Sequence, residues 1–119
     1  MVAFNFSPEF AGAVTSGAKV QTIRKTRRGK PGDAVQLYTG QRTKKCRKLR
    51  PDTTLCYVDY VHIAPDGLTF GNKEKHPGNA DAFAKRDGFK DFSDMLAWFQ
   101  KKYGASHFVG YVHRWKVEN

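Results

Sequence analysis

A lysine, a threonine and an arginine lie within six residues near the start of the chain, in the order Lys19-x-x-Thr22-x-Arg24. A threonine hydroxyl becomes a useful nucleophile only when a neighbouring base takes its proton. A lysine that is partly desolvated, or close to another cation, loses its own proton near neutral pH and can be that base. An arginine can hold an acyl oxygen or a phosphate through its fork of N–H donors. These residue types are therefore consistent with nucleophilic catalysis on an acyl or a phosphoryl group, with Lys19 as base, Thr22 as nucleophile and Arg24 as a substrate-binding residue.

The same string is also typical of a solvated strand edge in a basic chain. In an extended segment side chains alternate between two faces, so Lys19 would point away from Thr22 and Arg24. Gly17 comes just before the string, at the expected end of a helix, and a turn there would bring Lys19 back toward Thr22. Whether the three residues act together therefore depends on the elements that position them.

Hydrophobic periodicity predicts a strand, a helix, a run of strands, two helices and a final strand along the chain. Ser7 before Pro8, and Asp91 with Asp94, are typical of helix starts, and Gly17 and Gly104 of helix ends. We expect strands at 2–6, 35–38, 55–63, 68–70 and 107–117, helices at 8–16, 80–85 and 92–103, a turn at 30–33 and a polar loop at 71–79. In the last strand one side would carry Val109, Tyr111, His113, Trp115 and Val117. This order predicts one α+β domain over residues 1–119, a small mixed β-barrel with flanking helices.

Positive charge is concentrated in one part of the chain. The protein has 21 lysines and arginines against 11 acids, for a net charge of +10, and residues 19–50 contain 12 of the basic residues with a single acid, Asp33. Such a concentration is typical of a surface that binds a polyanion, although a merely solubilising basic loop is the alternative. Tyr38, on the strand before this stretch, could stack on a base. We expect an exposed nucleic-acid-binding lobe made by Arg42, Lys44, Lys45, Arg47, Lys48 and Arg50.

Several protein classes are disfavoured by composition. Cys46 and Cys56 form neither a disulfide framework nor a metal-binding spacing, and the histidines are scattered singly at 62, 76, 107 and 113. We therefore expect no metal and no cofactor. No apolar run is long enough to span a bilayer, and the first residues lack the pattern of a signal peptide, so we expect a cytoplasmic monomer without membrane contact.

Three groups of residues together resemble the ASCH domain family, which is related to PUA domains, and the resemblance covers nearly the whole chain. They are the Gly17-x-Lys19-x-x-Thr22-x-Arg24 string, the turn Lys30-Pro31-Gly32-Asp33 before a strand, and Asp87-Gly88-Phe89 leading into the helix with Phe92 and Met95. The stretch from Leu37 to Leu49 is also similar to small bacterial and prophage-encoded members. A PUA-like barrel is therefore the expected fold.

The resemblance implies two kinds of activity. Members of the family are thought to bind RNA, and small bacterial members include amidohydrolases that remove the acyl group from N4-acetylcytidine with a lysine, a threonine and a downstream glutamate. Lys19 and Thr22 match that pattern, while Asp87 stands where the family has glutamate and is one methylene shorter. Asp87 would pass a proton to the leaving nitrogen and activate water.

Three functions are therefore open from the sequence. The first is an amidohydrolase acting on an N4-acylated pyrimidine nucleoside. The second is an RNA-binding domain with or without ribonuclease activity, because another family member is similar to a metal-dependent ribonuclease. The third is a regulatory protein that pairs with an acidic partner.

Overall fold

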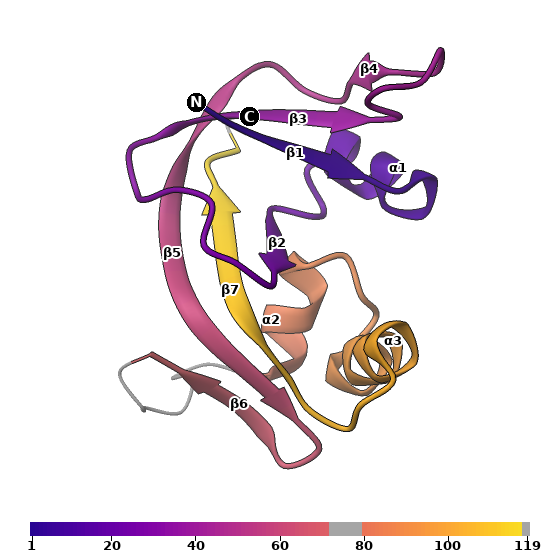
Figure 1. The fold of residues 1–119 in the computed structure, drawn as a ribbon, viewed down its shortest axis with the longest axis vertical. Coiled ribbons are helices and arrows are strands. Elements are labelled where there is room, and N and C mark those ends of the chain that lie inside the picture. Colours follow the sequence, from indigo (N-terminus) through magenta and orange to yellow (C-terminus); the bar gives the residue numbers. More distant parts are fainter. Residues whose placement is uncertain (72–79, 118–119) are drawn as a thin grey trace.

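The computed structural model describes residues 1–71 and 80–117 and confirms the α+β class. Within these residues the chain forms seven strands and three helices (Figure 1). In chain order they are β1 (Val2–Phe6), α1 (Pro8–Ser16), β2 (Gln21–Arg24), β3 (Ala34–Thr39), β4 (Arg47–Lys48), β5 (Thr53–Ala64), β6 (Gly67–Phe70), α2 (Ala80–Arg86), α3 (Phe92–Tyr103) and β7 (Phe108–Trp115). The predicted loop at 71–79 lies outside the described residues except for Gly71. No helix in the described ranges is both long and apolar enough to cross a membrane.

The strands form one strongly bent sheet that does not close. Its strand order is β1-β3-β5-β7-β2, with β4 added beside β3 and β6 beside β5, and only β1 and β3 run parallel among the described strands. The 12-residue β5 bends through the molecule (Figure 1), and its pairing with β7 is irregular between Leu55 and Tyr57. Strands β1 and β2 are the two ends of this path and do not pair with each other within the described residues. The predicted closed barrel is therefore not confirmed.

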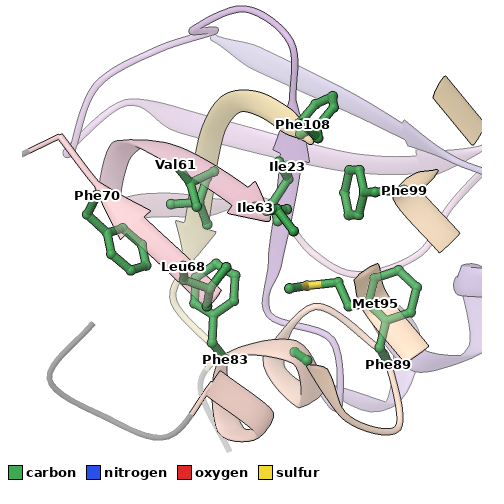
Figure 2. Close-up of a cluster of buried hydrophobic side chains, with 12 residues drawn as sticks. Ile23, Val61, Ile63, Leu68, Phe70, Phe83, Phe89, Met95, Phe99 and Phe108 are labelled. Carbon is green, nitrogen blue, oxygen red and sulfur yellow. The ribbon is translucent and has the colours of Figure 1, made fainter. Parts of the chain in front are cut away.

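Two hydrophobic cores lie on opposite sides of the central strands. One core, shown in Figure 2, fills the space between β5, β6, β7 and the helices α2 and α3, with Phe83, Met95 and Phe99 among its buried members. The other lies between β1, β3 and α1 and includes Phe4 and Trp115. Strand β7 contributes to both cores, so it connects the helical half of the protein to the β1–β3 half.

The burial pattern of β7 differs from the predicted alternation. Phe108 and Val112 are buried in the first core, His113 and Trp115 are buried on the other side, and Val109 is 51% exposed. The alternating pattern placed Val109 with His113 on one side, which is correct for strand geometry but does not predict burial. The reason is that the β1–β3 half covers only the C-terminal part of that side.

Helix starts and turns follow the local sequence, with one exception. Asp91 accepts a hydrogen bond from the main-chain N–H of Asp94 at 2.8 Å, as a helix cap does. Ser7 precedes α1 in the expected extended conformation but does not cap it, because its hydroxyl donates to Glu9 Oε1 at 3.3 Å instead. The predicted turn at 30–33 is confirmed by a main-chain hydrogen bond of 3.1 Å. The short strand β4 was not predicted, since its exposed residues show no periodicity.

Candidate active site

A pocket of about 150 Å³ lies between the C-terminal end of β1, strand β2 and the helices α1 and α3. It brings together four residues that the sequence analysis selected, although they come from separate parts of the chain. Its lining consists of Asn5, Phe6, Ser7, Phe10, Lys19, Thr22, Ile23, Arg24, Asp87, Phe89, Trp98, Phe99, Lys102 and Tyr103. The pocket is thus polar at Lys19, Thr22, Arg24 and Asp87, and aromatic along the two helices.

Lys19 reaches the pocket because it lies in the turn before β2, not on the strand. Gly17 ends α1 with a φ of 86°, a left-handed conformation that favours glycine. The main-chain N–H of Lys19 then donates to the Ala13 carbonyl at 2.9 Å, and that of Val20 donates to the Arg86 carbonyl at 2.8 Å. The alternation of an extended strand therefore does not apply to Lys19, and the turn that the sequence analysis required is present.

The Lys19 ammonium is held by Asp87 inside the pocket. Its Nζ donates a hydrogen bond to the main-chain carbonyl of Asp87 and lies 3.4 Å from Asp87 Oδ2, and both side chains are only 4% exposed. Gly88 makes this approach possible, because a Cβ at that position would be 3.2 Å from Lys19 Cδ. The ammonium also lies 4.9 Å from the centre of the Phe10 ring, which favours a cation.

Burial changes the protonation of both members of this pair. Desolvation raises the pKa of Asp87 to about 6, against the opposing effect of Lys19, and desolvation also lowers the pKa of Lys19 more than Asp87 raises it. Oδ1 of Asp87 is buried and has no hydrogen-bond partner among the described residues. The pair therefore combines a carboxyl that titrates close to neutral pH with a lysine that loses its proton more readily than a solvated one.

Thr22 and Arg24 are joined by a direct hydrogen bond. Arg24 Nε donates to Thr22 Oγ1 at 3.1 Å, so the hydroxyl of Thr22 keeps its own proton for a base to remove. Arg24 Nη2 donates to the main-chain carbonyl of Asn5 at 3.1 Å. Because Asn5 is in β1 and Arg24 in β2, this guanidinium links the two unpaired ends of the sheet beside the pocket.

His113 is a buried polar residue next to the site that sequence reasoning did not select. It lies opposite Thr22 in the β2–β7 register, and its Nε2 accepts a hydrogen bond of 3.0 Å from the main-chain N–H of Arg28. Burial lowers the pKa of His113 to about 4, so the ring is neutral at neutral pH. It fixes the loop after β2 against the sheet. Only the long-range pairing of β2 with β7 indicates this role.

The aromatic wall of the pocket was also missed. Phe10, Phe89 and Trp98 come from α1, the turn after α2 and α3, and their ring centres lie 5.5 to 5.7 Å apart. Helical spacing predicts Phe10 and the aromatics of α3 as core residues. Such periodicity cannot distinguish a ring that fills a core from one that lines a cavity between helices.

Tyr38 and the basic lobe lie away from the pocket lining. Tyr38 is half-buried on β3, where it pairs with Asn5 of β1 and Lys48 of β4, and its stacking on a base stays a prediction. In the lobe, Arg50 Nη1 donates to the Thr15 carbonyl near the end of α1 at 2.7 Å. The other basic residues of the lobe, all exposed, are Arg42, Lys44, Lys45, Arg47 and Lys48.

No group of three or more histidine, cysteine, aspartate or glutamate side chains in the described residues is arranged to hold a metal ion. Cys46 and Cys56 are both exposed free thiols. Two of the histidines that looked isolated in sequence do meet, because His62 Nε2 lies 2.9 Å from His107 Nδ1. This exposed pair does not line the pocket.

Comparisons of the chain with protein-family models, with curated proteins and with solved structures found no match. They therefore assign neither a family nor an activity.

Proposed function

We propose that this protein is an amidohydrolase that removes the acyl group from N4-acetylcytidine or a related N4-acylated pyrimidine nucleoside, and that it is an ASCH-type, PUA-like domain. The observation that carries the proposal is the meeting of Thr22 with the buried Lys19–Asp87 pair in one pocket. A hydroxyl, a lysine with a lowered pKa and a carboxyl with a raised pKa are the groups that amide hydrolysis through an acyl-enzyme needs.

Acylation begins with the pair in its neutral form, with the proton on Asp87. Lys19 takes the proton of Thr22 as Oγ1 bonds to the acyl carbon, and the carbonyl electrons move to the oxygen. N–H groups of Arg24 stabilise that negative charge. When the C–N bond breaks, Asp87 gives its proton to N4, which leaves cytidine, an acyl ester on Thr22 and a charged pair.

Deacylation restores the starting protonation of Asp87, Lys19 and Thr22. Asp87, now a carboxylate, takes a proton from the water that attacks the ester carbon. As the ester bond breaks, Lys19 returns its proton to Thr22 Oγ1 and acetic acid leaves, ionising in solvent. The cycle therefore uses one water molecule and needs no other reactant.

The size and walls of the pocket suit part of a nucleoside. A cavity of about 150 Å³ is smaller than the roughly 300 to 1,000 Å³ that commonly enclose a drug-sized ligand. It suits the pyrimidine with its acyl group, packed against Phe10, Phe89 and Trp98, with the sugar outside. Although aspartate is shorter than glutamate, Asp87 is part of the pocket lining, which supports the same proton-transfer role.

The direct test is to incubate the purified protein with N4-acetylcytidine and to measure cytidine and acetate. We expect both products in equal amounts, partial activity from Thr22→Ser, and a loss of about a thousandfold or more from Thr22→Ala. Absence of turnover by the wild-type protein at several pH values would overturn the proposal.

RNA binding is the second candidate function, with ribonuclease activity as an extension. It is favoured by the exposed cations of the lobe, of which Arg42, Lys44, Lys45 and Arg47 belong to no ion pair among the described residues. Polyanion binding weakens steeply as salt rises because counterions are released, whereas hydrolysis of a neutral nucleoside responds little. Salt titration of RNA binding and of turnover therefore separates the two functions.

A further inference from the structure

Cations gather at the edge of the pocket, where aromatic rings hold them. Lys102 lines the pocket with its Nζ 5.6 Å from the centre of the Trp98 ring. The Nζ of Lys25 lies 4.8 Å from the centre of the Tyr103 ring, and both rings belong to the pocket lining. Aromatic faces attract cations, so these two flexible side chains are kept near the pocket instead of extending into solvent.

Two guanidinium groups, one of them from the pocket lining, lie close to the same aromatic ring. Arg24 and Arg28 each have Cζ 5.2 Å from the centre of the Phe4 ring. Burial, and after it the positive charge of Arg28, lowers the pKa of Arg24. Such crowding is unfavourable unless an anion compensates it.

The protein supplies little negative charge to offset this group. Among the described residues Asp87 is the one acid in the pocket lining, and it already faces Lys19. The ion pairs among the described residues are Lys19–Asp87, Lys30–Asp33 and Lys48–Asp52. None of them includes Arg24, Lys25, Arg28 or Lys102. A free nucleoside carries no charge and would leave these cations uncompensated.

We propose that the preferred substrate carries a phosphate, so that the protein acts on an N4-acylated cytidine monophosphate in preference to the free nucleoside. This inference rests on the proposed amidohydrolase function and names its substrate class. The acylated base occupies the pocket, which is too small for the whole nucleotide, and the phosphate lies outside it, beside Lys25 and Lys102. Lysine binds phosphate as a point charge, and Arg24 remains at the acyl oxygen inside the pocket.

The test compares kcat/KM for N4-acetylcytidine with kcat/KM for its 5′-monophosphate and its 3′-monophosphate. We expect at least one monophosphate to exceed the nucleoside tenfold or more, mainly through a lower KM. The advantage should shrink as salt rises, because the cations are exposed and therefore screened.

Replacing the lysines at the pocket edge tests where the phosphate binds. The double variant Lys25→Ala with Lys102→Ala should lower the ratio of nucleotide to nucleoside kcat/KM about tenfold. Lys101→Ala is the matched control, because Lys101 precedes Lys102 in α3 and is also exposed but does not line the pocket, and it should leave the ratio unchanged. Circular dichroism checks that the wild-type protein and both variants are folded.

The outcomes separate this inference from the function on which it rests. Equal kcat/KM for the nucleoside and both monophosphates would overturn the phosphate inference and leave the amidohydrolase intact. A nucleotide preference that the double variant and the Lys101 variant change equally would overturn the assigned phosphate position. If none of the three compounds is hydrolysed, both proposals fail together.

Discussion

Two lysine–aspartate pairs in different regions of the protein have opposite chemistry. In the basic lobe, Lys48 Nζ lies 2.5 Å from Asp52 Oδ1 with the side chains 41% and 42% exposed, whereas the Lys19–Asp87 pair is 3.4 Å apart and 4% exposed. The lobe contact raises the pKa of Lys48 and lowers that of Asp52. In the pocket the pKa of the lysine is lowered and that of the aspartate is raised to about 6.

The difference shows that exposure to water determines the direction in which an ion pair shifts the pKa values of its two members. In the lobe, water stabilises both charges, so attraction is the larger effect and separates the two pKa values. In the pocket, removal of water penalises both charges by more than their attraction returns, so the two pKa values approach each other. The Lys48–Asp52 contact is the shorter of the two, yet that pair stays charged because water surrounds it. The Lys19–Asp87 contact is longer, and burial gives that pair the pKa shifts that proton transfer requires.

The largest expected effect is a loss of turnover, and it is tested by replacing one threonine in the pocket and one in the basic lobe. Thr22→Ala should lower the rate of N4-acetylcytidine hydrolysis about a thousandfold or more, because it removes the nucleophile. Thr43→Ala is the lobe counterpart, since the Thr43 hydroxyl bonds main-chain groups within the lobe, donating to the Gly40 carbonyl at 2.6 Å and accepting from the Lys45 N–H at 3.1 Å. Product formation by both variants is measured at equal protein concentration. Full activity of Thr22→Ala would exclude the covalent mechanism.

The second prediction concerns stability. Lys19→Met should lower the free energy of unfolding by about 3 kcal/mol at pH 8, because it leaves the buried Asp87 carboxylate without a cation. The effect should be smaller at pH 5, since removal of the lysine charge raises the pKa of Asp87 further and the carboxyl is then neutral. Lys48→Met should have no measurable effect at either pH.

Urea denaturation at the two pH values measures these effects. The sign follows from linkage: an aspartate whose folded pKa is raised above the usual 3.9 or so of an unfolded chain favours the folded state at low pH and loses that contribution as pH rises through the folded value. A destabilisation by Lys19→Met that is equal at pH 5 and pH 8 would contradict the buried-pair interpretation.

The third prediction is a pH profile that assigns a role to Asp87. Below pH 6 the wild-type kcat/KM should fall about tenfold per pH unit, because Asp87 and Lys19 are then both protonated and the pair has no base. Asp87→Asn should lower activity about a hundredfold and move this acidic limb to lower pH, because Lys19 then titrates without the carboxylate that raises its pKa. If Asp87 merely shapes the turn after α2, the asparagine variant keeps both the activity and the limb.

The smallest effect on turnover is expected from the lobe. Replacing Lys44, Lys45 and Arg47 with alanine should leave acyl-cytidine hydrolysis within about twofold of wild type, because these side chains are exposed and do not line the pocket. The same variant should bind single-stranded RNA more weakly, with a salt slope smaller by about 0.7 for each phosphate that it no longer neutralises.

A structural link between the two regions provides the alternative outcome. The main-chain N–H of Gln41, at the start of the lobe, donates to Asn5 Oδ1 at 2.9 Å, and Asn5 lines the pocket. A collapse of turnover in the triple variant would show that the lobe acts on the pocket as a lid. Unchanged RNA affinity would exclude the lobe as the RNA-binding surface.

Much of the fold follows from residues close together in sequence. The periodicity at 92–103 and the cap at Asp91 predicted α3 with its observed bounds, and Gly17 predicted the end of α1. These features depend on side chains three or four positions apart and on backbone conformations that one residue controls. Lys19, Thr22 and Arg24 could be selected for the same reason, since they share a short segment.

Only the tertiary structure determined the contacts and the pKa shifts of those residues. Asp87 is 68 positions from Lys19, and His113 pairs with Thr22 from the opposite end of the chain, so neither contact has a local pattern. The opposite pKa shifts of the buried pair depend on burial of both side chains, which no local spacing encodes. The sheet also stays open between β1 and β2, where Arg24 links the two strands through its side chain. Residue types and local spacing thus determined which groups were available, while long-range packing determined their charge, because burial is a property of the whole fold.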